Sequence, residues 1–529
     1  MSAASWVGPD DGCPPRSRPL SSPCRGHPTA REERAVPVPF PRPALAAAGL
    51  AAALVLGACG STTAGAEGRI RLAYAFVPVA GLSPYSDDAV IGYGIGATET
   101  LVSLDPAGAP QPVLAESWTR VDPLTWRFDL RPDVVFQDGT QLTADVVAES
   151  LQHAVDAQPT PRALSGVELG VATDGADAVV LTTTAPDPVL PQRLTSPELV
   201  VLSPAAYADP ASPDLVGTGT GPYELTALEG TSGATLDAFP GHWAGAPAAD
   251  GVDVSFLSEG SSRTAALRAD EVDVAQALPV SQLATLGDQD ELLSVPLPRT
   301  VALHLTTTSP VFGDPGLRET ARRAVADLDL AGTVFEGQAD APQGLFGPTS
   351  TWAADRTAPT YPDPVAAGGQ RVTLATFSDR AEMPEVATAL ADALRTAGFE
   401  VELVVRLYTE LEEDLLAGTY DAVLMSRSYG QDTADPLSYL SSDVGCAGGY
   451  NLSLYCDPAV DAELAAGSRL TDVTARTAVA LDVERTVLGS AAVVPVVHDR
   501  TRFGVAAGLT GLASDPWERS IITVETALR

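Results

Sequence analysis

Residues 371–377, RVTLATF, are predicted to form a strand. The stretch 384–397, PEVATALADALRTA, follows as an amphipathic helix and stops before Gly398, a residue type that commonly ends helices. A second strand pattern, EVELVV, occupies residues 400–405. Strand, helix and strand in this order predict a unit of the α/β class.

The N-terminal half has similar elements. Residues 70–76, IRLAYAF, alternate as a strand and open the folded part, and residues 126–130, WRFDL, predict another strand. A helix is expected over residues 143–155 with Thr143 as its N-cap. Its predicted apolar face comprises Val146, Val147, Ser150, Leu151 and Ala154. No repeat of 20–50 residues is visible, so a solenoid is not expected.

Length and composition fit a large, loop-rich globular protein. The chain has 529 residues, 45% of them apolar, with 44 prolines and 46 glycines, a length that allows about three structural units. Its 32 basic residues are all arginine and are outnumbered by 68 acidic residues, giving a net charge of -36. Such a chain is repelled by nucleic acid and by anionic lipid, because binding either requires neutralising phosphates. We expect a solvated acidic surface and no nucleic-acid partner.

The first 58 residues have the pattern of a leader. Residues 44–58, ALAAAGLAAALVLGA, are uninterruptedly apolar, but as a helix they would reach only about 22 Å, short of the roughly 30 Å hydrocarbon core. They predict a signal peptide. The following LGAC, residues 56–59, resembles the bacterial lipobox, which makes Cys59 the candidate lipidation site. Residues 1–35 do not fit a signal peptide, so translation is expected to start at Val36 or Val38.

Cys446 and Cys456 remain after Cys59 is assigned to lipid. Two cysteines ten positions apart in an exported chain predict a disulfide. A metal pair is the competing interpretation, and it is disfavoured because no histidine of the mature chain lies at ligand spacing from these cysteines. Neither a metal site nor a cofactor is expected.

Several blocks together resemble one family. In chain order they are ETLV (99–102), PVLAESW (112–118), WRFDLR (126–131), VFQDGT (135–140), GTGPY (219–223), the segment around His242 and Trp243, AALRADEVD (265–273) and LRETARRAV (317–325). Their order and spacing resemble family 5 of the bacterial solute-binding proteins, which includes dipeptide, oligopeptide and nickel binders. The resemblance covers essentially all of residues 69–529.

The resemblance implies an α/β, two-lobed periplasmic-binding-protein-like fold of type II, in the large peptide-binding class with an extra subdomain in lobe I. After the leader (1–58) and a linker (59–68), we expect lobe I at residues 69–302, lobe II at 303–495 and a C-terminal return to lobe I at 496–529. The chain should cross between lobes near residues 302–305 and return near 495–498. Two crossings make a hinge, so a ligand that touches both lobes would stabilise a closed form.

The binding signal lies in YGQDTADP, residues 429–436. By resemblance, Asp432 stands where peptide-binding members carry the aspartate that pairs with the α-amino group of the ligand. A buried carboxylate suits this task because it accepts charge-assisted hydrogen bonds from an ammonium. The structural alternative for Asp432 is a turn or helix cap, as expected for Asp435 before Pro436. Arg380 is the looser candidate for a ligand carboxylate, which a guanidinium binds bidentately.

These features predict an extracytoplasmic, lipid-anchored, monomeric binding protein of an ABC importer, not an enzyme. Its partners would be a di- or oligopeptide and the permease and ATPase subunits, as the family implies. The dipeptide binders carry a similar cysteine pair, which favours peptides over the alternative ligands, a nickel chelate or another small solute. A secreted hydrolase is the remote alternative, because the sequence has no Gly-x-Ser-x-Gly, no His-Glu-x-x-His and too few histidines for a triad.

Overall fold

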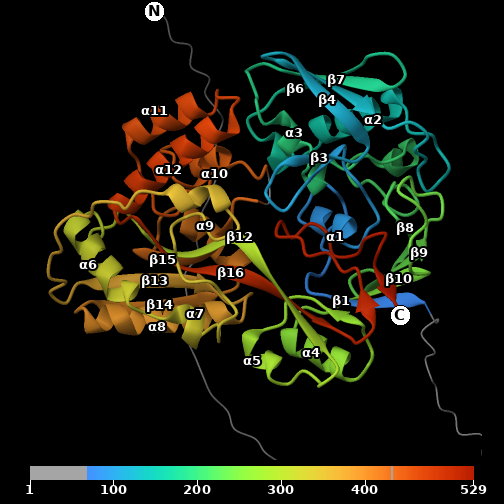
Figure 1. The fold of residues 1–529 in the computed structure, drawn as a ribbon. Helices are drawn as coiled ribbons and strands as arrows, with labels where there is room; N and C mark the ends of the chain where they lie inside the picture. Colours follow the sequence, from blue (N-terminus) through green and yellow to red (C-terminus); the bar gives the residue numbers. More distant parts are fainter. Residues whose placement is uncertain (1–67, 431–432) are drawn as a thin grey trace, which may run out of the picture. The chain divides into compact units, whose positions relative to one another are not determined.

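One mixed sheet of ten strands organises the described part of the chain (Figure 1). The computed structural model describes residues 68–430 and 433–529. In order across the sheet the strands are β14 (Glu400–Arg406), β13 (Arg371–Phe377), β15 (Ala422–Ser428), β12 (Glu291–Leu305), β16 (Val493–Val505), β11 (Val274–Ala275), β1 (Arg69–Tyr74), β10 (Gly251–Phe256), β9 (Gly233–Ala238) and β8 (Tyr223–Leu228). We call β1 and β8–β11 the N-terminal half of the sheet, and β13–β15 the C-terminal half.

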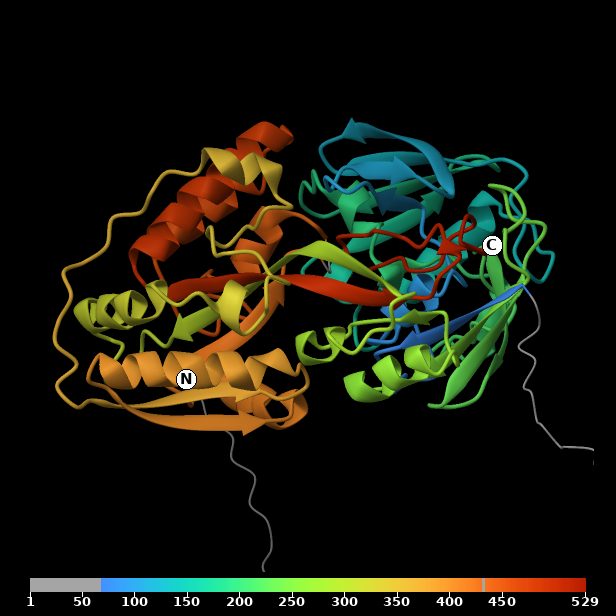
Figure 2. The same ribbon diagram turned by 60° about the horizontal axis from the view of Figure 1, so that its bottom comes forward.

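Strands β12 and β16 join the two halves (Figure 2). They pair antiparallel with each other, while residues 299–305 of β12 also pair with β15 and the end of β16 pairs with β11. The ladder between β12 and β16 shifts register between Pro296 and Thr300. Pro296 and Pro298 lack the N–H group that an unbroken ladder requires. The register shift therefore interrupts the pairing close to where β12 changes from one half of the sheet to the other.

The predicted strand–helix–strand unit is confirmed. β13 and β14 pair in parallel, with Arg371 opposite Glu400, and α8 (Glu382–Thr396) connects them. The predicted helix start at Pro384 was two residues late, because proline is compatible with the first helical turn and does not mark its beginning. The helix ends before Gly398, whose φ of +95° is one that glycine adopts without strain. Its apolar face packs on the sheet through Met383, Val386, Ala387, Leu390 and Leu394.

A separate four-stranded sheet lies within the N-terminal region. Its strands, in order, are β4 (Ala115–Asp122), β5 (Thr125–Leu130), β7 (Ala178–Thr183) and β6 (Leu169–Thr173). Helix α2 (Ala144–Asp156) contacts β6 and β7, and its predicted cap is confirmed, since Thr143 Oγ1 accepts a hydrogen bond from Val146 N. A core of its own holds this sheet and α2 together, as the extra subdomain of the predicted fold requires.

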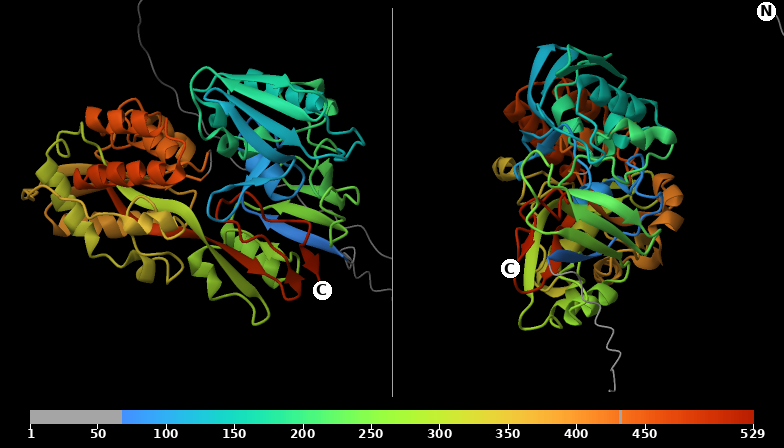
Figure 3. Two further views of the ribbon diagram at one scale, coloured as in Figure 1. Left: turned by 45° about the horizontal axis from the view of Figure 1, so that its top comes forward. Right: turned by 90° about the vertical axis from the view of Figure 1, so that its right-hand side faces the viewer.

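Three helices pack together on the C-terminal half (Figure 3). They are α10 (Pro436–Asp443), α11 (Pro458–Gly467) and α12 (Val473–Gly489). The other described α-helices are α1 (Ala89–Gly94), α3 (Leu190–Arg193), α4 (Gly260–Arg268), α5 (Val280–Leu283), α6 (Pro315–Ala326), α7 (Leu330–Thr333) and α9 (Tyr408–Leu416). Two small sheets pair β2 (Val102–Leu104) with β3 (Pro110–Pro112) and β17 (Leu509–Thr510) with β18 (Ala527–Leu528). Among the described helices, none combines the length and the apolarity that crossing a membrane requires.

The two segments predicted to carry the chain between lobes are neighbours in the sheet. Residues 302–305 lie in β12 and residues 495–498 lie in β16, and Ala302 pairs with Pro495. This pairing places both expected crossings on the two strands that the halves of the sheet share. The lobe boundaries themselves stay a prediction.

His498 on β16 is fully buried and fixes a long loop to the sheet. Gln343 N donates to its Nε2 at 3.1 Å, and its Nδ1 lies 3.0 Å from Thr300 Oγ1, which donates to Leu345 O. These contacts require a neutral ring with its proton on Nδ1. Burial, with the nearby Arg356 charge, lowers the pKa of His498 to about 4.

Stability should therefore depend on pH through His498. In the unfolded chain His498 becomes protonated below its ordinary pKa of 6.5, whereas in the folded chain it stays neutral down to about pH 4. The stability advantage of the wild type over His498→Asn should consequently shrink by about 2 kcal/mol between pH 7 and pH 5. Urea unfolding of both proteins at pH 7, 6 and 5 measures this, and a pH-independent difference would contradict it.

Candidate ligand-binding site

The segment between β15 and α10 is anchored on both sides of residues 431–432. On one side, Tyr429 Oη lies 2.7 Å from Ser350 Oγ, and Gly430 O accepts a hydrogen bond from Arg519 Nη2 at 2.9 Å. Asp435 holds the other side as the N-cap of α10. Asp432, the predicted ligand residue, lies outside the described residues, between these two anchors.

Asp435 has a structural role. Its carboxylate accepts from Ser438 N at 2.8 Å and forms a buried ion pair with Arg476 at 2.7 Å, with both side chains at most 6% exposed. Arg476 Nη1 in turn donates to three carbonyl groups in the turn between α11 and α12, including Ser468 O. The predicted cap at Asp435 is confirmed. Its ion pair could not be predicted from local patterns, because Arg476 is 41 residues away.

Aromatic side chains surround the first anchor. Tyr429 makes edge or tilted contacts with Phe346, Trp352, Tyr439 and Trp517, with ring centroids 5.4–6.5 Å apart. Burial raises the pKa of Tyr429 to about 12, so its hydroxyl stays neutral. These rings come from three distant segments, residues 346–352, 429–439 and 517, and no local pattern in the sequence joins them.

Arg380 lies just before α8 and is already paired. Its Nη1 is 3.0 Å from Asp499 Oδ2 on β16, and 31% of its side chain is exposed. Nearby on β12, Arg299 is buried and pairs with Glu518 at 2.5 Å. Burial lowers the pKa of Arg299, with the charge of Arg380 acting in the same direction and Glu518 opposing it. A ligand carboxylate at Arg380 would have to share the guanidinium with Asp499.

A pocket of about 170 Å³ lies between the four-stranded sheet and helices α10–α12. One wall is the loop of residues 183–189 with Arg193, and the other contains Ser438, Ser468 and Arg476. Arg193 pairs with Asp187 at 2.5 Å. The pocket thus has walls from both regions and lies beside α10. We call residues 429–435, which precede this helix, the candidate segment.

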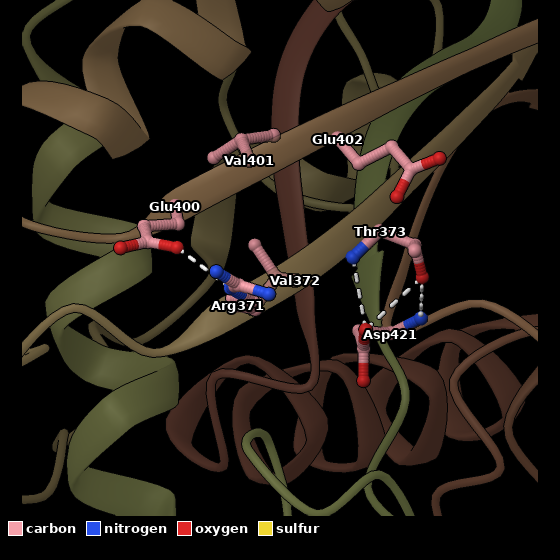
Figure 4. A pocket seen from close by; sticks show the side chains of 7 residues that line it. All are labelled: Arg371, Val372, Thr373, Glu400, Val401, Glu402 and Asp421. Carbon is pink, nitrogen blue, oxygen red and sulfur yellow. Dashed lines mark hydrogen bonds and ion pairs between the residues drawn. The ribbon is translucent and has the colours of Figure 1, made fainter.

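A larger hollow of about 390 Å³ lies on strands β13 and β14 (Figure 4). Its polar groups mostly pair with each other, as Arg371 binds Glu400 at 2.7 Å and Asp421 accepts from Thr373 N at 2.8 Å. Neither Arg380 nor any described residue of the candidate segment lines it. We therefore place the candidate site at the segment after β15 and not here.

The predicted cysteine pair lies in the loop after α10. Cys446 and Cys456 are joined by a disulfide. Within the loop the Asn451 amide donates to Gly445 O and Tyr455 O at 3.0 and 2.7 Å. Across residues 68–430 and 433–529, no group of three or more His, Cys, Asp or Glu side chains is placed to hold a metal ion.

Residues 109–451 match the sequence profile of the bacterial extracellular solute-binding proteins, family 5 middle region. The chain belongs to this family. Among curated relatives, a probable di/tripeptide-binding protein of Pseudomonas aeruginosa is 28% identical over 444 residues, covering 75% of this chain and 84% of the relative.

Solved structures of family 5 proteins share the fold. A dipeptide-binding protein of Pseudoalteromonas in complex with Met-Leu has a TM-score of 0.74 at 18% identity, covering 87% of this chain and 99% of that one. A NikA protein of Brucella suis in complex with Fe(III)-EDTA has a TM-score of 0.77 at 19% identity, covering 87% and 100%. The two-lobed α/β fold expected from the sequence is confirmed.

The sequence blocks that resemble family 5 predicted the fold more successfully than they predicted the residues of the site. Of the predicted site residues, Arg380 is described but faces Asp499, while Asp432 and Cys59 lie outside the described residues. Sequence reasoning missed Trp517 and Arg519, which lie beside the candidate segment although they are almost 90 residues further along the chain. Only the sheet topology, which returns the C-terminus to this region, identifies them.

Asp435→Asn should destabilise the protein by about 3–5 kcal/mol, because it leaves the Arg476 charge buried without its partner. Asparagine still caps a helix, so the effect isolates the ion pair. The matched control is Asp472→Asn on α12, an exposed cap that accepts from Ala475 N; its effect should stay within about 0.5 kcal/mol. Urea unfolding checks both, and equal effects would contradict the role of the ion pair.

Proposed function

We propose that this chain is the solute-binding subunit of an ABC importer and that it binds di- or oligopeptides between its two lobes. The proposal rests on the contacts of the candidate segment after β15. Gly430 accepts a hydrogen bond from Arg519, and Tyr429 packs on Trp517, both in the C-terminal loop that returns to the other half of the sheet. The Pseudomonas relative named as a di/tripeptide binder and the neighbour holding Met-Leu support peptides as the ligand. The peptide leaves unchanged, for delivery to a permease driven by ATPase subunits.

The binding roles follow from charge. Asp432 would accept hydrogen bonds from the α-ammonium of the peptide, and closure of the lobes would strengthen this contact by removing water. Arg380 would meet the peptide carboxylate while Asp499 orients its guanidinium. The surrounding aromatic rings supply an apolar wall for side chains.

Closure requires two lobes that move about the shared strands. We assign residues 69–302 and 496–529 to lobe I and residues 303–495 to lobe II. The register shift between Pro296 and Thr300 supports a hinge at this place. The protein would act as a monomer, because each chain carries both walls of its own site.

A metal chelate is the second candidate ligand. The Brucella neighbour holds Fe(III)-EDTA, and another, from Staphylococcus aureus, holds Ni(L-His)2 at a TM-score of 0.73 and 17% identity. A chelate brings its own ligands, so it needs few histidines from the protein. Titration with Ni(L-His)2 beside the peptides separates the two ligand classes.

Asp432→Asn should weaken binding of the dipeptide Met-Leu by roughly 30-fold to several thousand-fold, since an ammonium buried without its counter-charge costs about 2–5 kcal/mol. Its melting temperature should hardly change. Calorimetric titration should also show that the wild type prefers Met-Leu over N-acetyl-Met-Leu and that the variant loses this preference.

The control variant Asp472→Asn should bind both peptides as the wild type does. Equal binding of the two peptides by the wild type would remove the ammonium role from Asp432. Binding of Ni(L-His)2 without binding of Met-Leu would replace the peptide by a chelate as the ligand.

We further propose that lipid on Cys59 anchors the protein outside the cytoplasm. Cys59→Ala should release the protein into the medium with its affinity for Met-Leu intact, because Cys59 is distant in sequence from the residues proposed to bind the peptide. Cys24→Ala should leave the distribution unchanged, since Cys24 is not part of the lipobox-like stretch at residues 56–59. Immunoblots of membrane and medium fractions measure this; a Cys59→Ala protein that stays with the membrane would refute lipid anchoring.

A further inference from the structure

Three consecutive residues of the C-terminal loop contact three distant parts of the molecule. Trp517 Nε1 donates to Asp105 O in the turn between β2 and β3 at 2.7 Å. Glu518 binds Arg299 on β12, and Arg519 donates to Gly430 O. The Asp515 carboxylate builds this loop by accepting from the backbone N–H groups of residues 517, 519 and 520. The loop therefore links the N-terminal region, a shared strand and the candidate segment.

The Trp517 indole fits between two glycines. It is 4% exposed and packs in the same core cluster as Tyr429 and the helices α10 and α12. A Cβ atom added at Gly430 would lie 2.4 Å from Cε3 of the indole, and one at Gly108 would lie 3.0 Å from Cζ2. Gly108 belongs to the turn between β2 and β3, and Gly430 follows β15. The ring thus fills the space between two regions that a hinge motion would separate.

Glycine is required at position 430 because there is no space for a side chain, and not because of its backbone conformation. Gly108 has a φ of +89°, which favours glycine whatever surrounds it, whereas Gly430 is not among the residues with positive φ. Alanine would be allowed at Gly430 by its backbone, yet the indole leaves no room for a methyl group. The pair of Gly430 and Trp517 is therefore matched in shape.

We propose that Trp517 is a positioning residue that locks the closed form, by seating its indole between Gly108 in the turn between β2 and β3 and Gly430 after β15. This inference rests on the proposed function, since it assumes that ligand binding closes the lobes. Because the indole lies against both Gly430 and Gly108, opening the lobes must unseat the ring from one of them. Ligand dissociation should consequently depend on this contact.

The first test is a double-mutant cycle with Met-Leu as the probe. Gly430→Ala should weaken binding by roughly ten-fold or more, mainly through faster dissociation, because the methyl group keeps the indole from seating. The control Gly449→Ala has nothing within 4 Å of its added Cβ and should change affinity by less than about two-fold. Trp517→Leu should also weaken binding, and adding Gly430→Ala to it should cost nothing further. If alanine is equally harmful with and without the indole, the proposal is wrong.

The second test needs no ligand. The signal of Trp517 is the difference between the tryptophan fluorescence of the wild type and that of Trp517→Phe. Trp118→Phe is the control for losing a tryptophan elsewhere in the chain. Gly430→Ala should raise acrylamide quenching of this signal, and Gly449→Ala should not. Equal quenching in both glycine variants would overturn the contact.

The two tests separate two kinds of failure. A wild type that does not bind Met-Leu contradicts the proposed peptide function. The acrylamide quenching of Trp517 still tests whether the indole packs on Gly430. A wild type that binds Met-Leu with an affinity and a dissociation rate that Trp517→Leu leaves unchanged refutes the locking role alone. Addition of Met-Leu to the wild type should lower the quenching of Trp517, since closure excludes acrylamide from the ring.

Discussion

The antiparallel pairing of β12 with β16 is the constraint on which the rest of the structure depends. These two strands carry Arg299, Thr300, His498 and Asp499 in adjacent positions. Through them, the C-terminal loop, the loop of residues 340–347 and the start of α8 are each fixed to the same short stretch of sheet. The candidate site draws on these distant segments, and one ladder sets the position of all of them.

Arginine supplies the cation of the ion pairs named above, and the chain contains no lysine. The guanidinium presents several donors in a fixed plane, so one side chain can hold a carboxylate and several carbonyl groups together. Arg476 does this between Asp435 and the turn after α11, and Arg356 does it between Glu484 and Phe346 O. Loops around the candidate site are thereby fixed by buried, directional contacts.

Local patterns in the sequence predicted those elements whose causes are local. The strands beginning at Arg371 and Glu400 and the cap at Thr143 depend on neighbouring residues, and they were found within two residues. The partners of Arg380 and Asp435 could not be found in this way, because Asp499 and Arg476 approach them only through sheet topology and helix packing. Family resemblance supplied the fold and the segment around Asp432, but not the tryptophan that packs beside it.

Strand β14 forms one outer edge of the ten-stranded sheet, where unpaired backbone groups offer a template for a strand of another molecule. The exposed side chains of Glu400, Glu402 and Arg406 alternate along this strand, and Arg371 lies across from Glu400. Pairing with a strand of a second copy would remove water from these charged side chains, which costs free energy. Charged side chains along an edge strand disfavour polymerisation of neighbouring molecules through their sheets.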